Sequence, residues 1–196
     1  NCFFAETYSL KSNKDKNFFR KESFDIGLCT SWQRIIPKDV LSSFRFGVFG
    51  WHGSGYEFPN GRGRSPINWS IRLGLDMIFH NCFRYSEGVD DGDVYETKKL
   101  TIKKNDYIED VQEKAIEHIC DSAIRLISDI CDNKLKLSKQ INNPFISFPA
   151  LNEKSGQIYP SQLNVSSAQN IVRSCSHPFP GAYVVLPEYD AIIRIW

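Results

Sequence analysis

The sequence carries almost no net charge with which to attract a large polyanion. Its 196 residues include 24 basic and 23 acidic side chains, for a formal net charge of +1. Proteins that bind nucleic acid or an anionic membrane usually present a basic face, so we expect neither kind of partner. A local basic pocket for a phosphorylated small molecule is compatible with this balance.

Long apolar runs are also missing, so we expect no segment that crosses a bilayer, and no stretch has the layout of a signal peptide. The six cysteines include no C-x-x-C pair and no histidine at metal-ligand spacing, and we therefore predict no metal site. We interpret them as reduced, mostly buried thiols of a cytoplasmic protein.

Three common enzyme motifs of α/β proteins are absent: the G-x-S-x-G elbow, the P-loop and the dinucleotide fingerprint. The pattern of apolar runs nevertheless predicts an α/β fold with a mainly parallel, Rossmann-like sheet flanked by helices. Strands are predicted at 24–29, 47–51, 77–85 and 94–102, with a terminal hairpin at 183–186 and 191–196. Helices are predicted at 37–43, 67–73, 107–132 and 166–174.

We expect one domain over residues 1–196. Residues 1–23 form an irregular start with room for a short helix, 24–135 the core, and 136–196 a C-terminal helix and hairpin segment. In such folds the active site lies in loops beyond the carboxyl ends of the strands.

One candidate for chemistry is the glycine-rich stretch GWHGSGYEFPNGRGRSPINW. His52 directly follows the predicted strand 47–51, where a strand delivers its next side chain into a crevice. Arg62 and Arg64 follow, and their guanidinium groups could hold an anion. The alternative is a structural histidine on a flexible loop.

A second candidate is the acidic segment EGVDDGDV, in which Glu87, Asp90, Asp91 and Asp93 crowd together. Such carboxylates repel one another unless they are solvated, hydrogen-bonded or bound to a cation. They could form a solvated turn, or supply an acid that orients His52 for general acid-base catalysis. Calcium binding is a third interpretation, but the EF-hand spacing is missing.

Five segments, in this order, resemble the formyltransferase family that uses 10-formyltetrahydrofolate as formyl donor. They are FDIGLCTSWQRIIPKDVL, HGS followed by PNGRG, PINWSIRLG, EGVDDGDV, and AQNIVRS followed by HPFPGAYV. This family includes methionyl-tRNA formyltransferase, glycinamide ribonucleotide transformylase and the sugar N-formyltransferases. The resemblance runs from about Phe24 to Trp196 and implies the formyltransferase fold. The family's opening strand and helix are not recognisable before Phe24, so we expect the N-terminal part to be absent or diverged.

The resemblance also implies roles for individual residues. His52 matches the catalytic histidine, which would stabilise an oxyanion and shuttle a proton, and Asp90 matches the aspartate that would orient it. Two segments, the turn 31–36 and the backbone 87–90, would line the pterin pocket. Their implied cofactor-binding residues are Ser31, Trp32, Arg34, Ile36, Glu87 and Val89.

One departure from the family pattern concerns the catalytic centre. Family members carry an asparagine two residues before the histidine, and this chain has Gly50 there. We expect an amide donor to come from elsewhere, with Asn68 as the nearest candidate, or the chain to be a catalytically impaired relative that binds folate or a sugar nucleotide.

The closing segments FPGAYV and EYDAIIRIW most resemble enzymes that formylate a nucleotide-linked amino sugar, as in glycan biosynthesis. We therefore expect a sugar-nucleotide substrate, with Arg62, Arg64 and Arg173 as candidates to contact its diphosphate. Each arginine could equally be solvated or structural. Methionyl-tRNA formyltransferase and formyltetrahydrofolate hydrolase are the alternative activities, and the terminal hairpin could form a homodimer interface.

Overall fold

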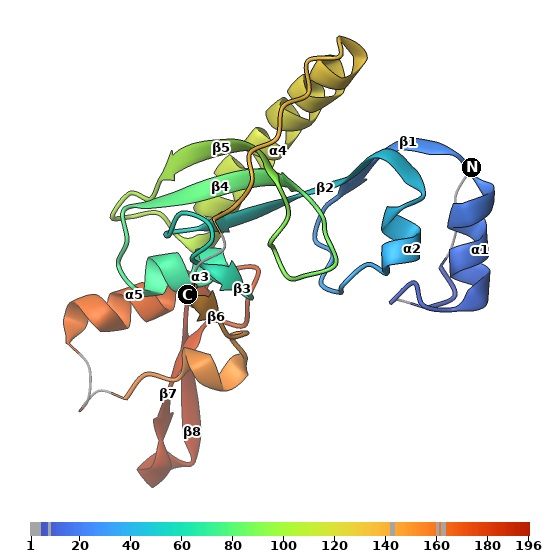
Figure 1. Ribbon diagram of the computed structural model, residues 1–196. Coiled ribbons are helices and arrows are strands. Elements are labelled where there is room, and N and C mark those ends of the chain that lie inside the picture. Colours follow the sequence, from blue (N-terminus) through green and yellow to red (C-terminus); the bar gives the residue numbers. More distant parts are fainter. Residues whose placement is uncertain (1–4, 8, 142–143, 160, 162–163) are drawn as a thin grey trace. The chain divides into compact units, whose positions relative to one another are not determined.

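The sheet that carries the candidate residues has the strand order β1-β2-β4-β5 (Figure 1). Its strands are β1 (Phe24–Cys29), β2 (Phe44–Ser54), β4 (Met77–Arg84) and β5 (Val94–Thr101). β1 and β2 pair in parallel, with Leu28 opposite Phe49. This is a computed structural model that describes residues 5–7, 9–141, 144–159, 161 and 164–196. The predicted α/β class, with a mainly parallel sheet, is confirmed.

Every predicted helix is present within two residues of its expected bounds. The helices are α2 (Lys38–Leu41), α3 (Pro66–Arg72), α4 (Ile108–Cys131) and α5 (Val165–Cys175). The predicted hairpin is β7 (Ala182–Leu186) with β8 (Ala191–Ile195), which pair antiparallel around the 3-10 turn η2 (Pro187–Tyr189). Not predicted were the short pair β3 (Arg62–Gly63) with β6 (Ser147–Phe148) and the 3-10 turn η1 (Glu153–Gly156).

Contacts within the chain group the described residues into two compact units. The first unit takes residues from 1–52, 81–97 and 119–142, and the second from 53–80, 98–118 and 143–196. Strands β2, β4 and β5 and helix α4 therefore contribute residues to both units.

In the first unit, neighbouring residues of β2 pack against different helices. Val48 lies in an apolar cluster with Val40 of α2, whereas Phe49 lies in another with Leu126 and Ile130 of α4. Because successive side chains of a strand point to opposite faces, α2 and α4 cover opposite faces of β2.

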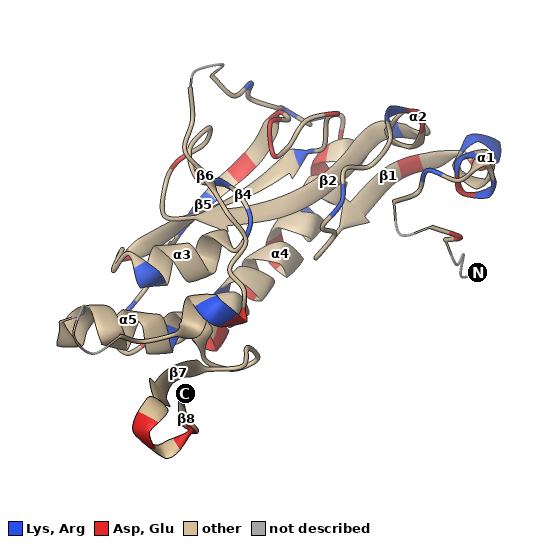
Figure 2. Cartoon of the chain, turned by 90° about the horizontal axis from the view of Figure 1, so that it is seen from below, with Lys and Arg blue, Asp and Glu red and all other residues tan. Residues whose placement is uncertain are grey.

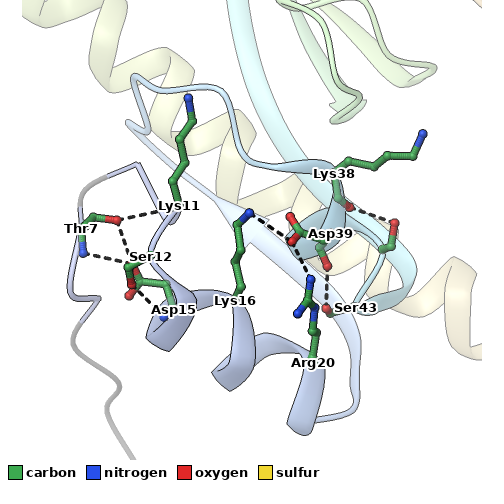
Figure 3. Close-up of polar contacts among 10 residues, drawn as sticks. Thr7, Lys11, Ser12, Asp15, Lys16, Arg20, Lys38, Asp39 and Ser43 are labelled. Atoms are coloured by element: carbon green, nitrogen blue, oxygen red, sulfur yellow. Dashed lines mark hydrogen bonds and ion pairs between the residues drawn. The ribbon is translucent and has the colours of Figure 1, made fainter.

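The expected irregular start contains a helix, α1 (Asn13–Lys21), whose first turn is capped by the Ser12 hydroxyl. Figure 3 shows how α1 is attached to α2: Lys16 and Arg20 reach the carboxylate of Asp39 at 3.3 and 3.0 Å. Both basic and acidic residues occur on these two helices (Figure 2). A charged, amphipathic segment with few apolar residues thus forms a docked helix.

In the second unit, Ile71 of α3, Ile78 of β4 and Val111 of α4 form the main apolar cluster. A separate cluster joins Ile171 of α5 to Ala182 of β7. No helix among the described residues is both long and apolar enough to span a membrane.

The expectation of mostly buried thiols is wrong for two cysteines. Cys120 and Cys131 are exposed on α4, because the buried positions of that helix are taken by residues such as Leu126. Cys82 is buried, Cys29 and Cys175 are half-buried, and all five are free thiols. Cys2 lies outside the described residues.

Candidate active site

His52 lies inside β2 and not in the loop after it, because the strand extends through Ser54. The side chain is buried, with 8% of the residue exposed. Its carbonyl accepts a hydrogen bond from the amide nitrogen of Asn81 on β4, at 3.4 Å, and the Asn81 carbonyl oxygen in turn accepts one from the Thr97 hydroxyl at 2.6 Å. This support was not predicted from the sequence, in which its one signal is the single amide side chain in the mainly apolar run MIFHNCFRY.

Asp90 lies in the loop between β4 and β5, with a left-handed backbone (φ 51°) that aspartate tolerates better than most residues. The loop is held by Gln140, whose amide nitrogen donates to the carbonyl oxygens of Asp90 and Gly92 at 2.9 and 2.8 Å. A side chain at Gly92 would collide with the carbonyl oxygen of Arg84, so glycine is required there. Gln140 was not predicted from the sequence, because it follows the long helix and belongs to no motif.

The structure brings the two predicted catalytic side chains together. Nδ1 of His52 and Oδ2 of Asp90 are 3.5 Å apart, and their side chains are 7% and 21% exposed. A carboxylate in this position favours the tautomer with its proton on Nδ1.

The two segments expected to bind folate lie side by side. Lys38, just after the first segment, pairs with Glu87 of the second at 2.7 Å. Apolar Ile35 and Val89 are exposed on these segments, and Trp32 packs half-buried against the cluster around Val48.

Three of the residues expected to bind folate differ in how exposed their side chains are. Ile36 is buried in the core, so its backbone and not its side chain is available. Ser31 and Arg34 are exposed.

The remaining predicted residues belong to the second unit. Asn68 is buried and its amide nitrogen donates to the carbonyl oxygen of Ser174 at 2.8 Å. Arg173 is buried and its guanidinium donates to the carbonyl oxygens of Asp106 and Lys103 and to the Asn170 side chain. These contacts favour a structural role for both residues.

The other two arginines differ in exposure. Arg62 is 7% exposed, with its guanidinium carbon 4.5 Å from the centre of the Phe145 ring. Arg64 is exposed, so it is the arginine best placed to meet a solvent-borne anion.

Comparison with known proteins identifies the family of the chain. The profile of a family described as formyl transferase matches residues 5–123, a span that includes His52 and Asp90. A methionyl-tRNA formyltransferase of Prochlorococcus marinus (strain MIT 9312) is 31% identical over 98 residues, which are 50% of this chain and 29% of that protein. The chain thus matches under a third of that relative's length.

Solved structures share the fold. A sugar N-formyltransferase from Shewanella sp FDAARGOS_354 superposes with a TM-score of 0.74 at 18% identity, covering 95% of this chain and 74% of the other. HypX from Aquifex aeolicus, solved in complex with tetrahydrofolic acid, gives a TM-score of 0.64 at 16% identity, covering 88% and 29%. At these identities the likeness establishes the fold alone.

Proposed function

The chain belongs to the formyl transferase family, and on this premise we propose that it transfers a formyl group from 10-formyltetrahydrofolate to an amine. The observation that carries the proposal is the pair of buried His52 and half-buried Asp90, 3.5 Å apart within the matched segment. The two side chains supply a base and the group that orients it.

The reaction requires one bond to form and one to break. The acceptor amine bonds to the formyl carbon, the bond from that carbon to the folate nitrogen breaks, and the proton lost by the amine ends on that nitrogen. Nε2 of His52 carries the proton, and Asp90 stabilises the imidazolium while it does so. Such proton transfer contributes roughly 100- to 10,000-fold in rate.

The folate would bind along the segments 31–36 and 87–90. Their contact through Lys38 and Glu87 and their exposed apolar side chains support this placement. The tetrahydrofolic acid held by the HypX protein of the same fold is a second support.

The acceptor that we propose is an amino sugar carried on a nucleotide. The near-neutral charge argues against a large polyanionic substrate. The Shewanella protein, which superposes over 95% of this chain, is a sugar N-formyltransferase by name, and the closing segments build α5, β7 and β8. Arg64 is the exposed guanidinium that we assign to the diphosphate.

A second acceptor is the amine of methionyl-tRNA, because the Prochlorococcus relative carries that activity in its name. The two acceptors differ strongly in charge, so binding of the tRNA would weaken steeply with salt, whereas binding of the sugar nucleotide would change little.

The test is formyl transfer measured by folate absorbance with a panel of nucleotide-linked amino sugars and with methionyl-tRNA. We expect turnover on an amino sugar, reduced at least 100-fold in His52→Ala and in Asp90→Asn. Exposed His177→Ala and Asp25→Asn are matched controls and should retain the rate of the unmodified chain.

Other outcomes would each contradict a named part of the proposal. Formate release without an amine would identify a hydrolase. Turnover on methionyl-tRNA alone would identify methionyl-tRNA, and not an amino sugar, as the acceptor. Folate binding without turnover on any amine would identify an impaired relative and overturn the enzymatic assignment.

A further inference from the structure

The space left by the missing asparagine at Gly50 is filled by a tyrosine. A Cβ built on Gly50 would lie under 3.0 Å from three atoms of the Tyr85 ring and hydroxyl, closer than real Cβ contacts come. No side chain at position 50 is compatible with Tyr85 in this place. The absence of an amide side chain at position 50 and the position of the Tyr85 phenol are therefore coupled, because the two cannot occupy the same space.

Tyr85 is fixed where β4 ends and the loop to Asp90 begins. Its backbone nitrogen donates to the carbonyl oxygen of Val48 at 2.7 Å, which sets the end of β4 against β2 two residues before Gly50. Its ring packs half-buried against the cluster of Ile36, Val40 and Val48. Strand pairing and packing together hold the ring over Gly50.

The hydroxyl of Tyr85 is a protonated donor. Burial raises the pKa of this phenol, and a hydrogen bond to the Cys29 thiol and the charge of Asp90 raise it further. Burial also raises the pKa of Cys29, so its sulfur is a neutral, weak acceptor. A substrate oxygen would compete easily with that sulfur for the phenol proton.

The phenol and His52 lie on one face of β2. Alternate residues of a strand share a face, so the space above Gly50 lies on the side from which His52 projects, roughly 7 Å along the strand. Asp90 contacts His52 from the loop that Tyr85 begins. A hydrogen-bond donor, a base and its orienting acid thus gather at one place in the first unit.

We propose that Tyr85 is the third catalytic residue, whose hydroxyl donates a hydrogen bond to the formyl oxygen in place of the amide that Gly50 lacks. The inference rests on the proposed function. A neutral phenol in a partly buried site is the kind of donor that stabilises charge developing on a carbonyl oxygen.

The first test compares Tyr85→Phe, which keeps the ring and removes the hydroxyl, with Tyr95→Phe as a matched control. The Tyr95 hydroxyl bonds to Asp129 at 2.7 Å and lies outside the site. We expect kcat to fall about 100- to 1,000-fold in Tyr85→Phe with the folate KM little changed, and to stay near its normal value in Tyr95→Phe. A kcat within threefold of the unmodified chain in Tyr85→Phe would overturn the inference.

A second measurement does not depend on turnover. Calorimetry would compare binding of a stable N10-formyl deazafolate with binding of the same molecule without its formyl group. We expect Tyr85→Phe to weaken binding of the formylated analogue alone, roughly fivefold. Equal weakening of both ligands would assign the ring to packing and overturn the donor role. If the unmodified chain formylates no amine, the proposed function fails, while this comparison still decides what Tyr85 contacts.

A third test places asparagine at position 50 and removes the tyrosine at position 85. Gly50→Asn alone should collide with Tyr85 and lower both melting temperature and rate, and Tyr85→Ala alone should remove the donor. The double variant supplies an amide and the room for it, so we expect a rate at least tenfold above either single variant. A double variant no faster than the single ones would contradict the shared role of the two positions.

Discussion

In the proposed mechanism, the two ring nitrogens of His52 have different tasks. Nδ1 faces the Asp90 carboxylate at 3.5 Å, which favours the tautomer with the proton on Nδ1. Nε2 would then exchange a proton with the substrate. Burial of the ring among strand residues holds it in one orientation, which a catalytic base requires.

Arg173 is buried and Arg64 is exposed, so we expect different roles for the two arginines. We predict that Arg173→Ala lowers the free energy of unfolding by about 3 kcal/mol, since the buried Arg173 side chain is removed and the carbonyl oxygens of Asp106 and Lys103 lose their donor. Arg64→Ala should raise KM for the sugar nucleotide and should destabilise the chain less than Arg173→Ala, because Arg64 is exposed. Thermal melts and steady-state kinetics of both variants measure this. A stable Arg173→Ala variant with a raised KM would contradict the structural role.

The proximity of His52 and Asp90 could be predicted from the sequence because each lies in a short motif whose residue types and order are specific. The position of Tyr85 could not, because it depends on which side chain fills the space above Gly50. The partners of Arg173 could not be predicted either, because two of them are main-chain carbonyl oxygens, which every residue has.

Strand β2 is longer than predicted, because its glycines allow close packing against residues of the adjacent strand. The segment from Gly50 to Ser54 has the glycine content of a loop, yet it continues the strand. A Cβ on Gly53 would lie under 3.0 Å from the His80 ring, so this glycine is needed for close packing and not for flexibility. A single sequence does not distinguish these two uses of glycine.

Helix α1 depends on a buried carboxylate. Asp15 is fully buried and accepts hydrogen bonds from the backbone of Glu6, from Thr7 and from Ser12. Burial alone would raise its pKa, but these hydrogen bonds outweigh burial and lower the pKa from 3.8 to about 2. The stabilisation is therefore complete above about pH 4 and is lost as pH falls toward about 2.

We predict that Asp15→Asn lowers the melting temperature near neutral pH and that its difference from the unmodified chain shrinks between about pH 4 and about pH 2. Thermal melts across this range measure the effect. Asp25→Asn, at an exposed carboxylate, is the matched control and should show little difference at any pH. A difference for Asp15→Asn that stays constant down to pH 2 would contradict this account of α1.

For the molecule as a whole, the α/β class followed from the alternation of apolar strands and helical segments, and five motifs in order indicated the family. The grouping into two units did not follow, because the dividing points fall inside β2, β4, β5 and α4. Periodicity predicts where an element lies, but not which of its residues pack with which unit.

We propose that His52 and Asp90 form the site of formyl transfer, and a structure with a bound formyl-folate analogue would decide this. We predict density for the pterin along the segments 31–36 and 87–90, with the formyl group within hydrogen-bond distance of His52 Nε2, about 3 Å. An analogue bound away from His52 and Asp90, with both side chains left out of contact, would contradict the account.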